Sequence, residues 1–227
     1  MIETWDRVLV FAAHTDDEII GVGGTIARLS ALGKQVVVVT FTGGETSYQK
    51  GQTPEEMRNM RMQEATACDR ILGISRRIMM GRPTQGVVND RETYQLCVRI
   101  IREVRPDVIF THYGMDKHRD HRAVSEMTDE ARWKASEHVL GDMGDPYYTQ
   151  HLYFYEGSEC FEYPSIVVDI TDTFERKMEA MRSQESQMPV LPGVMDFLEG
   201  LAKVRGSQRG TRYAEAFLAS ALLPTFV

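Results

Sequence analysis

Short runs of apolar residues alternate along the chain with longer stretches in which apolar residues recur every three or four positions. The runs are typical of buried strands, and the longer stretches are typical of amphipathic helices. The expected strands cover residues 7–13, 35–41, 77–80, 107–111, 152–155 and 166–168. The second run holds four consecutive valines, which indicates a strand that is covered by helices on both faces.

Helices are expected between these strands, and several carry recognisable start and stop signals. The segment Thr53-Pro54-Glu55-Glu56 combines a capping residue, a proline at the first helical position and a capping-box glutamate. The first two expected helices end at Gly33 and Gly73, and the third runs from an Asp90 cap to Pro106. The fourth covers residues 122–136, the fifth runs from an Asp172 cap to residue 184, and the last covers 194–204. This alternation predicts an α/β fold with a mostly parallel sheet, and we expect one domain over residues 1–227.

Composition and charge exclude several functional classes. The 227 residues carry a net charge of −7, and the 26 basic residues form no dense run, which argues against a nucleic-acid partner. No apolar stretch reaches the roughly 18–20 residues that span a bilayer, so no membrane span is predicted. The first residues lack the basic and apolar regions of a signal peptide, and the three cysteines are widely spaced, so we expect a cytoplasmic protein.

Two clusters of chemically active residues follow two of the expected strands. The first cluster, residues 14–18, reads His-Thr-Asp-Asp-Glu and follows the first strand. The second cluster, residues 118–121, reads His-Arg-Asp-His and follows the apolar run at 108–110. Ligand sites in parallel sheets lie beyond the carboxyl ends of the strands, so we expect the two clusters to form one site.

The residue types in these clusters are those of a metal-dependent hydrolase. Two imidazoles and one carboxylate, from His14, His121 and Asp17, match the ligand sets of catalytic zinc and of non-haem iron. A hydrolase also needs a base for the water and an acid for the leaving group, roles that Asp16 and His118 could fill. Asp120 could orient one of the histidines through its ring N–H or cap the following helix.

These clusters also carry a resemblance to a known family. Residues 14–18 resemble the His-Pro-Asp-Asp-Glu motif of the PIG-L/LmbE-like zinc-dependent N-deacetylases, and residues 118–121 resemble their His-Pro-Asp-His motif. The similarity extends in the same order to residues 23–26, 40–44, Arg61 and Glu64, 105–108, Ser183-Gln184 and 213–217. Either motif alone is weak, whereas the ordered pair at matching strand ends is specific.

The resemblance implies a Rossmann-like three-layer αβα sandwich and an enzyme that removes the N-acetyl group from a small amino sugar or its conjugate. It implies Zn²⁺ as cofactor, with Fe²⁺ as the alternative, and makes His14, Asp17 and His121 the metal ligands. It also implies that Asp16 is the general base, that His118 is the acid or oxyanion partner, and that Arg61 contacts the substrate. Thr15 and Arg119 replace the usual prolines of the two motifs. Arg119 adds a positive charge that would favour an acidic substrate.

Other interpretations of the same residues stay open at this point. The segment Gly21-Val22-Gly23-Gly24 suggests a Rossmann-type nucleotide site, although the third glycine of that fingerprint falls on Ile26. A non-catalytic metal-binding relative is a further alternative. Arg61 and Glu64 could form an i,i+3 pair on a solvated helix face. His112 is interpreted as structural, Glu18 receives no catalytic role, and association into a homo-oligomer is left open.

Overall fold

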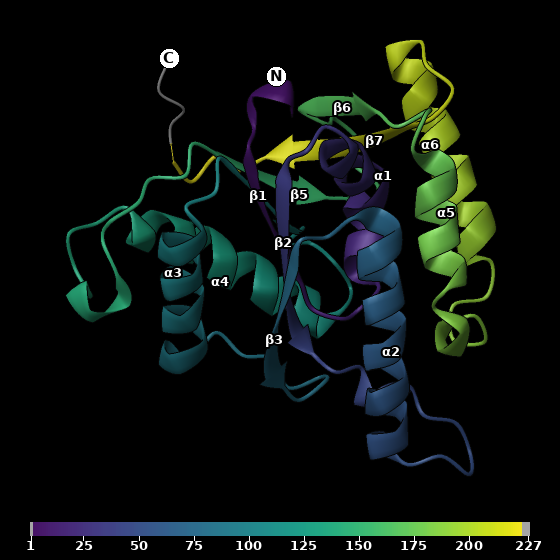
Figure 1. Cartoon of the computed structure of the whole chain (residues 1–227), viewed down its shortest axis with the longest axis horizontal. Coiled ribbons are helices and arrows are strands. Elements are labelled where there is room, and N and C mark those ends of the chain that lie inside the picture. Colours follow the sequence, from purple (N-terminus) through teal and green to yellow (C-terminus); the bar gives the residue numbers. More distant parts are fainter. Residues whose placement is uncertain (1, 224–227) are drawn as a thin grey trace.

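A seven-stranded sheet forms the centre of the protein, seen here in a computed structural model that describes residues 2–223 (Figure 1). Its strands lie in the order β3-β2-β1-β4-β5-β7-β6. Their bounds are β1 Arg7–Ala12, β2 Gln35–Thr42, β3 Arg76–Arg82, β4 Val108–His112, β5 His151–Tyr155, β6 Ile166–Asp169 and β7 Ala214–Ala219. The first five strands pair in parallel, whereas β7 is antiparallel to both of its neighbours. The predicted α/β fold with a mostly parallel sheet is confirmed.

Helices cover both faces of the sheet and complete the predicted three layers (Figure 1). One face carries α1 (Asp17–Ala31), α2 (Pro54–Leu72), α5 (Phe174–Arg182) and α6 (Val194–Arg209), and the other carries α3 (Arg91–Val104) and α4 (Arg119–Ala135). In the described part of the chain, four 3-10 turns complete the order: η1 (Ile2–Thr4), η2 (Glu45–Ser47), η3 (Gly141–Met143) and η4 (Glu185–Gln187).

The largely apolar sequence of the central strands follows from this arrangement. Successive side chains of a strand point to opposite faces, so Val8 and Val10 pack in the core under α1, α5 and α6. Leu9 and Phe11, on the alternate positions, pack in the second core under α3 and α4. Because helices cover both faces, every residue of β1 after Arg7 is buried.

Several local predictions are confirmed and others are wrong. Thr53 and Glu56 form the expected capping box, and the Asp90 side chain accepts from the backbone N–H of Thr93. The cap expected at Asp172 is absent, because α5 follows Thr173 without a side-chain capping bond. The helix expected from residue 122 begins at Arg119, with His118 as its N-cap, so Asp120 lies in the first turn and is not the cap. Strand β7 was not predicted at all.

The glycine-rich segment of α1 packs against the sheet and does not face a ligand. Gly21 and Gly24 lie inside the helix, and both are buried. A Cβ atom on Gly21 would lie 2.1 Å from Cδ2 of Tyr155, and one on Gly24 would lie 2.6 Å from Cδ1 of Ile170. The glycines therefore allow the helix to approach the sheet closely, and this removes the basis for a phosphate-binding interpretation.

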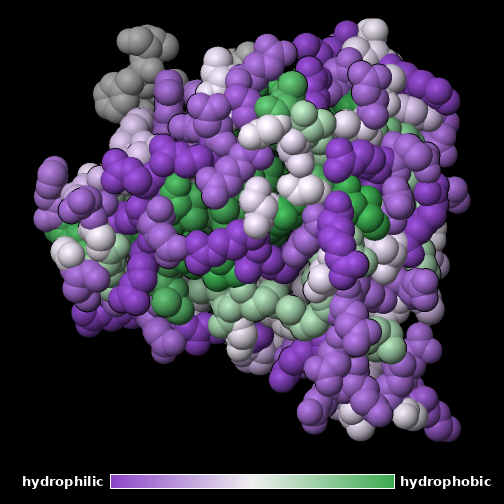
Figure 2. Space-filling view, in the orientation of Figure 1, coloured by the Kyte–Doolittle hydropathy of each residue, from purple (hydrophilic) through white to green (hydrophobic). Residues whose placement is uncertain are grey.

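The surface agrees with the charged composition. Figure 2 shows a face that is mostly hydrophilic, with apolar side chains in small separate patches. Within residues 2–223, no helix has the length and apolar character needed to span a bilayer.

Candidate active site

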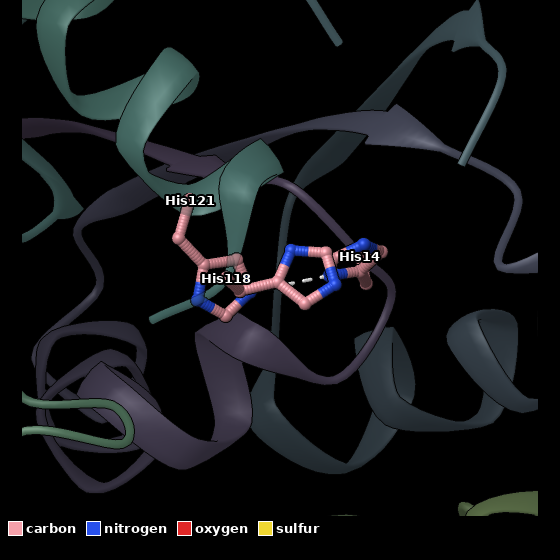
Figure 3. A group of neighbouring side chains, drawn as sticks. All are labelled: His14, His118 and His121. Atoms are coloured by element: carbon pink, nitrogen blue, oxygen red, sulfur yellow. Dashed lines mark hydrogen bonds between the residues drawn. The ribbon is translucent and has the colours of Figure 1, made fainter. Parts of the chain in front are cut away.

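The two clusters meet beyond the carboxyl ends of β1 and β4, as predicted. His14 follows β1, and Asp17 is the first residue of α1. His118 precedes α4 as its N-cap, and His121 lies in the first turn of that helix. Figure 3 shows His118 and His121 extending from the beginning of α4 toward His14. Residues that are more than a hundred positions apart are thereby placed side by side.

Two imidazole nitrogens and the two oxygens of one carboxylate converge at the centre of this site. His14 Nδ1 lies 3.2 Å from Asp17 Oδ2, His121 Nε2 lies 3.3 Å from His14 Nδ1, and His121 Nε2 lies 3.3 Å from Asp17 Oδ1. A tetrahedral ion with ligand bonds of about 2.0–2.1 Å separates its ligands by roughly 3.3–3.4 Å. The three predicted ligands are thus spaced like one face of such a tetrahedron, and the fourth corner remains for water or substrate.

Two buried carboxylates lie behind these histidines and orient them. His14 Nε2 is 3.2 Å from Asp120 Oδ2, and His121 Nδ1 is 3.0 Å from Asp116 Oδ2. A carboxylate at one ring nitrogen favours N–H there and leaves the lone pair of the other nitrogen free for a cation. Asp120 also accepts from the backbone N–H groups of Gln85 and Val87, which ties the loop after β3 to the site.

The electrostatic balance of the centre favours a bound cation. Burial by itself lowers the pKa of His14, but the carboxylates of Asp17 and Asp120 outweigh burial and raise the pKa to about 9. Burial also lowers the pKa of His121, but the carboxylates of Asp17 and Asp116 outweigh burial and raise this pKa to about 10. Burial raises the pKa of Asp17, but His121, His112 and His14 together lower it well below its usual range. The same charges that hold protons here would attract a metal ion.

His112 is nearer to the site than the sequence indicated. Its ring stacks on that of His121 with centroids 3.9 Å apart, and its Nε2 lies 3.1 Å from Asp17 Oδ2. Asp17, His112 and His121 form one group of residues close enough to hold an ion, and His14, His118 and His121 form another. However, His112 Nε2 accepts the backbone N–H of Ala13 at 3.0 Å, so its lone pair is already engaged. Burial, with His121, lowers the pKa of His112 to about 4.

Asp16 lies beside the donors and is held by a buried arginine. Arg61 Nη2 is 3.1 Å from Asp16 Oδ1, and both side chains are buried. Arg61 Nη1 donates to Gln184 Oε1 at 3.3 Å, and Gln184 Nε2 donates to the backbone carbonyl of Glu64 at 3.2 Å. Arg61 and Glu64 do form the i,i+3 ion pair, with Arg61 Nη1 3.7 Å from Glu64 Oε2, but both side chains are buried, so only the expectation of a solvated helix face is wrong. Helix α2 presents Arg61 to the site, and Gln184, after α5, holds it there.

His118 has one ring nitrogen available for chemistry. Its Nδ1 accepts the backbone N–H of Asp120 at 3.2 Å, which places the proton of the neutral ring on Nε2. Burial and the neighbouring rings of His14 and His121 lower the pKa of His118. His118 lines the cavity, so its Nε2–H can donate to a bound group.

A cavity of about 620 Å³ opens over these residues, a volume typical of small-molecule sites. One wall is polar and comes from the loops after β2, β3 and β4 and after β5, with Gly44, Thr46, Ser47, Thr84, Lys117 and Ser158. Another part of the wall is apolar and includes Ile20, Val190, Leu191, Pro192, Val194 and Phe197. The floor holds His14, Asp16, Asp17, Arg61, His112, His118, His121 and Tyr155.

The remaining motif residues lie away from this cavity or support it from behind. Glu18 is fully buried and lies 2.6 Å from Arg77 Nη2, so it joins α1 to β3. Arg119 is exposed and is absent from the cavity lining, whose cationic side chains are Arg61 and Lys117. Asp116 was missed by sequence reasoning, although its position two residues before His118 was a usable signal. Gln184 had no signal in its own surroundings that pointed to Arg61.

Comparison with known proteins agrees with this geometry. The PIG-L family, described as GlcNAc-PI de-N-acetylase, matches residues 9–132, more than half of the chain. A diacetylchitobiose deacetylase of Thermococcus kodakarensis is 30% identical over 222 residues, which cover 92% of this chain and 81% of that protein. The N,N'-diacetylchitobiose deacetylase structure from Pyrococcus horikoshii superposes with a TM-score of 0.87 at 27% identity, covering 96% of this chain and 85% of that one.

A third similarity shows that the fold alone does not define the reaction. GalB, a 4-carboxy-2-hydroxymuconate hydratase from a Pseudomonas, shares the fold with a TM-score of 0.84 at 22% identity, covering 97% of this chain and 98% of that one. The family match and the similarity to the Thermococcus protein rest instead on sequence, and they span both clusters. The chain belongs to the PIG-L family.

Proposed function

We propose that this protein is a metal-dependent hydrolase that removes the N-acetyl group from an N-acetylated amino sugar or its conjugate. The observation that carries the proposal is the convergence of His14 Nδ1, Asp17 and His121 Nε2 at 3.2–3.3 Å in a cavity that also contains Asp16 and His118. Membership of the PIG-L family and the two similar diacetylchitobiose deacetylases support the amide bond of an amino sugar as the substrate.

His14, Asp17 and His121 are proposed to hold the metal, because their donor atoms have the spacing and chemistry of a three-ligand catalytic site. A metal bound there would lower the pKa of a water molecule and polarise the amide carbonyl. Nitrogen and carboxylate ligands suit zinc and ferrous iron alike, so we propose zinc with iron as the alternative.

The remaining polar residues of the floor divide the proton transfers between them. Asp16 would accept the proton of the attacking water, and Arg61 Nη2, 3.1 Å away, keeps its carboxylate in place. His118 would donate its Nε2 proton to the carbonyl oxygen as charge develops there, or to the departing amine. Arg61 lines the cavity and is proposed to contact substrate as well, and Asp120 is proposed to orient His14.

Metal content tests the assignment of ligands directly. Purified protein should hold about one divalent ion per chain, and His14→Ala, Asp17→Ala and His121→Ala should each lower the occupancy sharply. His138→Ala is a matched control, because that histidine is exposed and does not line the cavity. Full metal retention in all three ligand variants would show that the assigned site is wrong.

Acetate release from diacetylchitobiose and from N-acetylglucosamine-type substrates tests the reaction. Asp16→Asn should keep the metal but lose roughly 10²–10⁴-fold in turnover, because an amide cannot accept the proton of water. His118→Ala should also keep the metal and lose rate, whereas Asp142→Asn, an exposed control, should do neither. If Asp16→Asn lost the metal altogether, the roles of Asp16 and Asp17 would have to be exchanged.

The competing hypotheses predict other results in the same experiments. A nucleotide-binding protein would bind NAD or ATP, but the buried glycines of α1 leave no approach for a phosphate. A non-catalytic relative would bind metal and release no acetate. We further propose a single domain over residues 1–227 and a cytoplasmic location, the first supported by the continuous sheet and the second by sequence composition alone.

A further inference from the structure

One buried arginine, Arg77 of β3, joins three elements of the fold behind the cavity. Its side chain is only 6% exposed, and it does not line the cavity. Its Nη2 donates to Glu18 Oε1 of α1 at 2.6 Å, and its Nη1 donates to Thr40 Oγ1 of β2 at 2.7 Å. Its Nε and Nη2 both donate to the carboxylate of Asp69 on α2, at 2.6–3.2 Å. A single guanidinium thus fixes α1, β2 and α2 relative to one another.

Two of these elements also place Asp16. Asp16 is the N-cap of α1, and Glu18 is the second residue of that helix. Arg61, whose Nη2 lies 3.1 Å from Asp16 Oδ1, belongs to α2 and precedes Asp69 by about two helical turns. The ion pairs therefore close a ring, which runs from α1 to α2 through Arg61 and returns to α1 through Arg77.

The ring depends on the shape of an arginine as well as on its charge. A guanidinium presents its N–H groups in fixed directions, so the hold of Arg77 on Asp69 also aims the remaining N–H groups at Glu18 and Thr40. A lysine would keep the positive charge but could not hold three acceptors in fixed directions. Desolvation offsets much of the attraction in a buried ion pair, so such a ring contributes more to geometry than to net stability.

We propose that Arg77 is a positioning residue for the reaction, which acts through Glu18 and the first turn of α1 to hold the Asp16 carboxylate in place. The inference rests on the proposed function, in which Asp16 accepts the proton of the attacking water. The first turn can transmit the effect, because the backbone N–H groups of Ile19 and Ile20 both donate to the carbonyl of Asp16 at 3.0 Å. A misplacement of about 1 Å can lower a rate by roughly 10²-fold.

Arg77→Lys tests the proposal, and Arg102→Lys is its matched control. Arg102 is also buried, and it donates to backbone carbonyls between residues 134 and 144 that lie outside the cavity lining. Both substitutions keep the charge and lose the planar fork. Arg77→Lys should lower kcat for acetate release by about ten- to a hundredfold, with KM within about twofold and metal content unchanged. Arg102→Lys should leave kcat, KM and metal content unchanged.

Combined variants show whether Arg77 acts through Asp16. Adding Arg77→Lys to Asp16→Asn should change the remaining rate by less than about threefold, because the base that Arg77 positions is already lost. Added to His118→Ala, the same substitution should keep its full effect. Equal losses in the Asp16→Asn and wild-type backgrounds would overturn the proposal. An unchanged kcat, a rise in KM alone or a loss of the metal in Arg77→Lys would overturn it too.

Amide hydrogen exchange measures the positioning without turnover. In Arg77→Lys, the amides of Ile19 and Ile20 should exchange at least about tenfold faster relative to those of β2, which report opening of the whole sheet. In Arg102→Lys this ratio should stay at the wild-type value. If the wild type releases no acetate, the proposed function fails, and an unchanged ratio in Arg77→Lys would then refute the hold of Arg77 on the first turn. If acetate is released and Arg77→Lys changes neither the ratio nor kcat, the function stands and the positioning role is refuted.

Discussion

The close contact between α1 and the sheet gives a prediction whose sign is unusual. Alanine is favoured over glycine inside a helix by about 1 kcal/mol, so Gly21→Ala would ordinarily stabilise the protein. Here the new Cβ would lie 2.1, 2.6 and 2.8 Å from three ring carbons of Tyr155, and ordinary contact begins at 3.4 Å. The ring cannot withdraw freely, because it is buried and its hydroxyl donates to the carbonyl of Phe11 at 3.0 Å.

The magnitude follows from these opposing effects. Overpacking a core costs about 1–3 kcal/mol, and a broken buried hydrogen bond that leaves a carbonyl unsatisfied costs about 1–3 kcal/mol more. After the helix-propensity gain of about 1 kcal/mol, Gly21→Ala should lower the free energy of unfolding by about 1–5 kcal/mol. For a chain of this length that corresponds to a Tm lower by roughly 2–20 °C. Activity should fall too, because Tyr155 lines the cavity and its ring centroid lies 4.8 Å from that of His112.

Gly200→Ala is the matched control for this experiment. Gly200 also lies inside a helix, α6, but it is exposed and a Cβ there would meet no atom within 4 Å. The same substitution should therefore stabilise the protein by about 0.5–1 kcal/mol. Both variants would be unfolded thermally and in urea with a chelator present, so that metal binding does not contribute. A Gly21→Ala protein as stable as the wild type would refute the packing argument.

Three further predictions concern other side chains. The Glu215 carboxylate accepts from the backbone N–H groups of Gly24 and Thr25 and from Lys177 Nζ at 2.7–2.9 Å. Glu215→Gln would leave the buried lysine without its carboxylate, so the free energy of unfolding measured in urea should fall by about 3–5 kcal/mol. A loss below about 1 kcal/mol would contradict this. Gln184→Leu should lower kcat about tenfold and leave the metal content unchanged, because Arg61 loses a hydrogen-bond acceptor worth about 1 kcal/mol. An unchanged kcat would show that Gln184 does not position Arg61. Of the three cysteines only Cys160 is exposed, so a thiol reagent should modify one thiol in the native chain and three after unfolding. Burial raises the pKa of Cys160, so its reaction should quicken as the pH rises through that pKa.

Most of the fold could be predicted from local sequence, because the relevant signals act over a few residues. The capping box at Thr53 and Glu56 and the four valines of β2 specify helix start and strand burial within their own segments. The meeting of the two clusters was predicted for a related reason. In a parallel sheet the strand ends lie at one edge, so residues that follow two neighbouring strands must meet.

Strand β7 shows where local signals fail. Its sequence Ala-Glu-Ala-Phe-Leu-Ala favours helix by intrinsic propensity and gives no strand signal. It forms a strand because pairing with β5 and β6 and the burial of Phe217 outweigh that preference. Glu215 is likewise placed inside the protein because Lys177 and two backbone N–H groups of α1 are there to meet it.

The sequence by itself identified the candidate site residues, and the tertiary structure decided what surrounds them. The histidines and aspartates of the two clusters belong to short motifs that can be read in place. The partner of Asp16 is Arg61, held by Gln184, and the apolar wall comes from residues 190–197 together with Ile20. These contacts join segments separated by about 45 to 175 residues, and no local pattern specifies them. They exist only because α1, α2, α5 and α6 pack on the same face of the sheet.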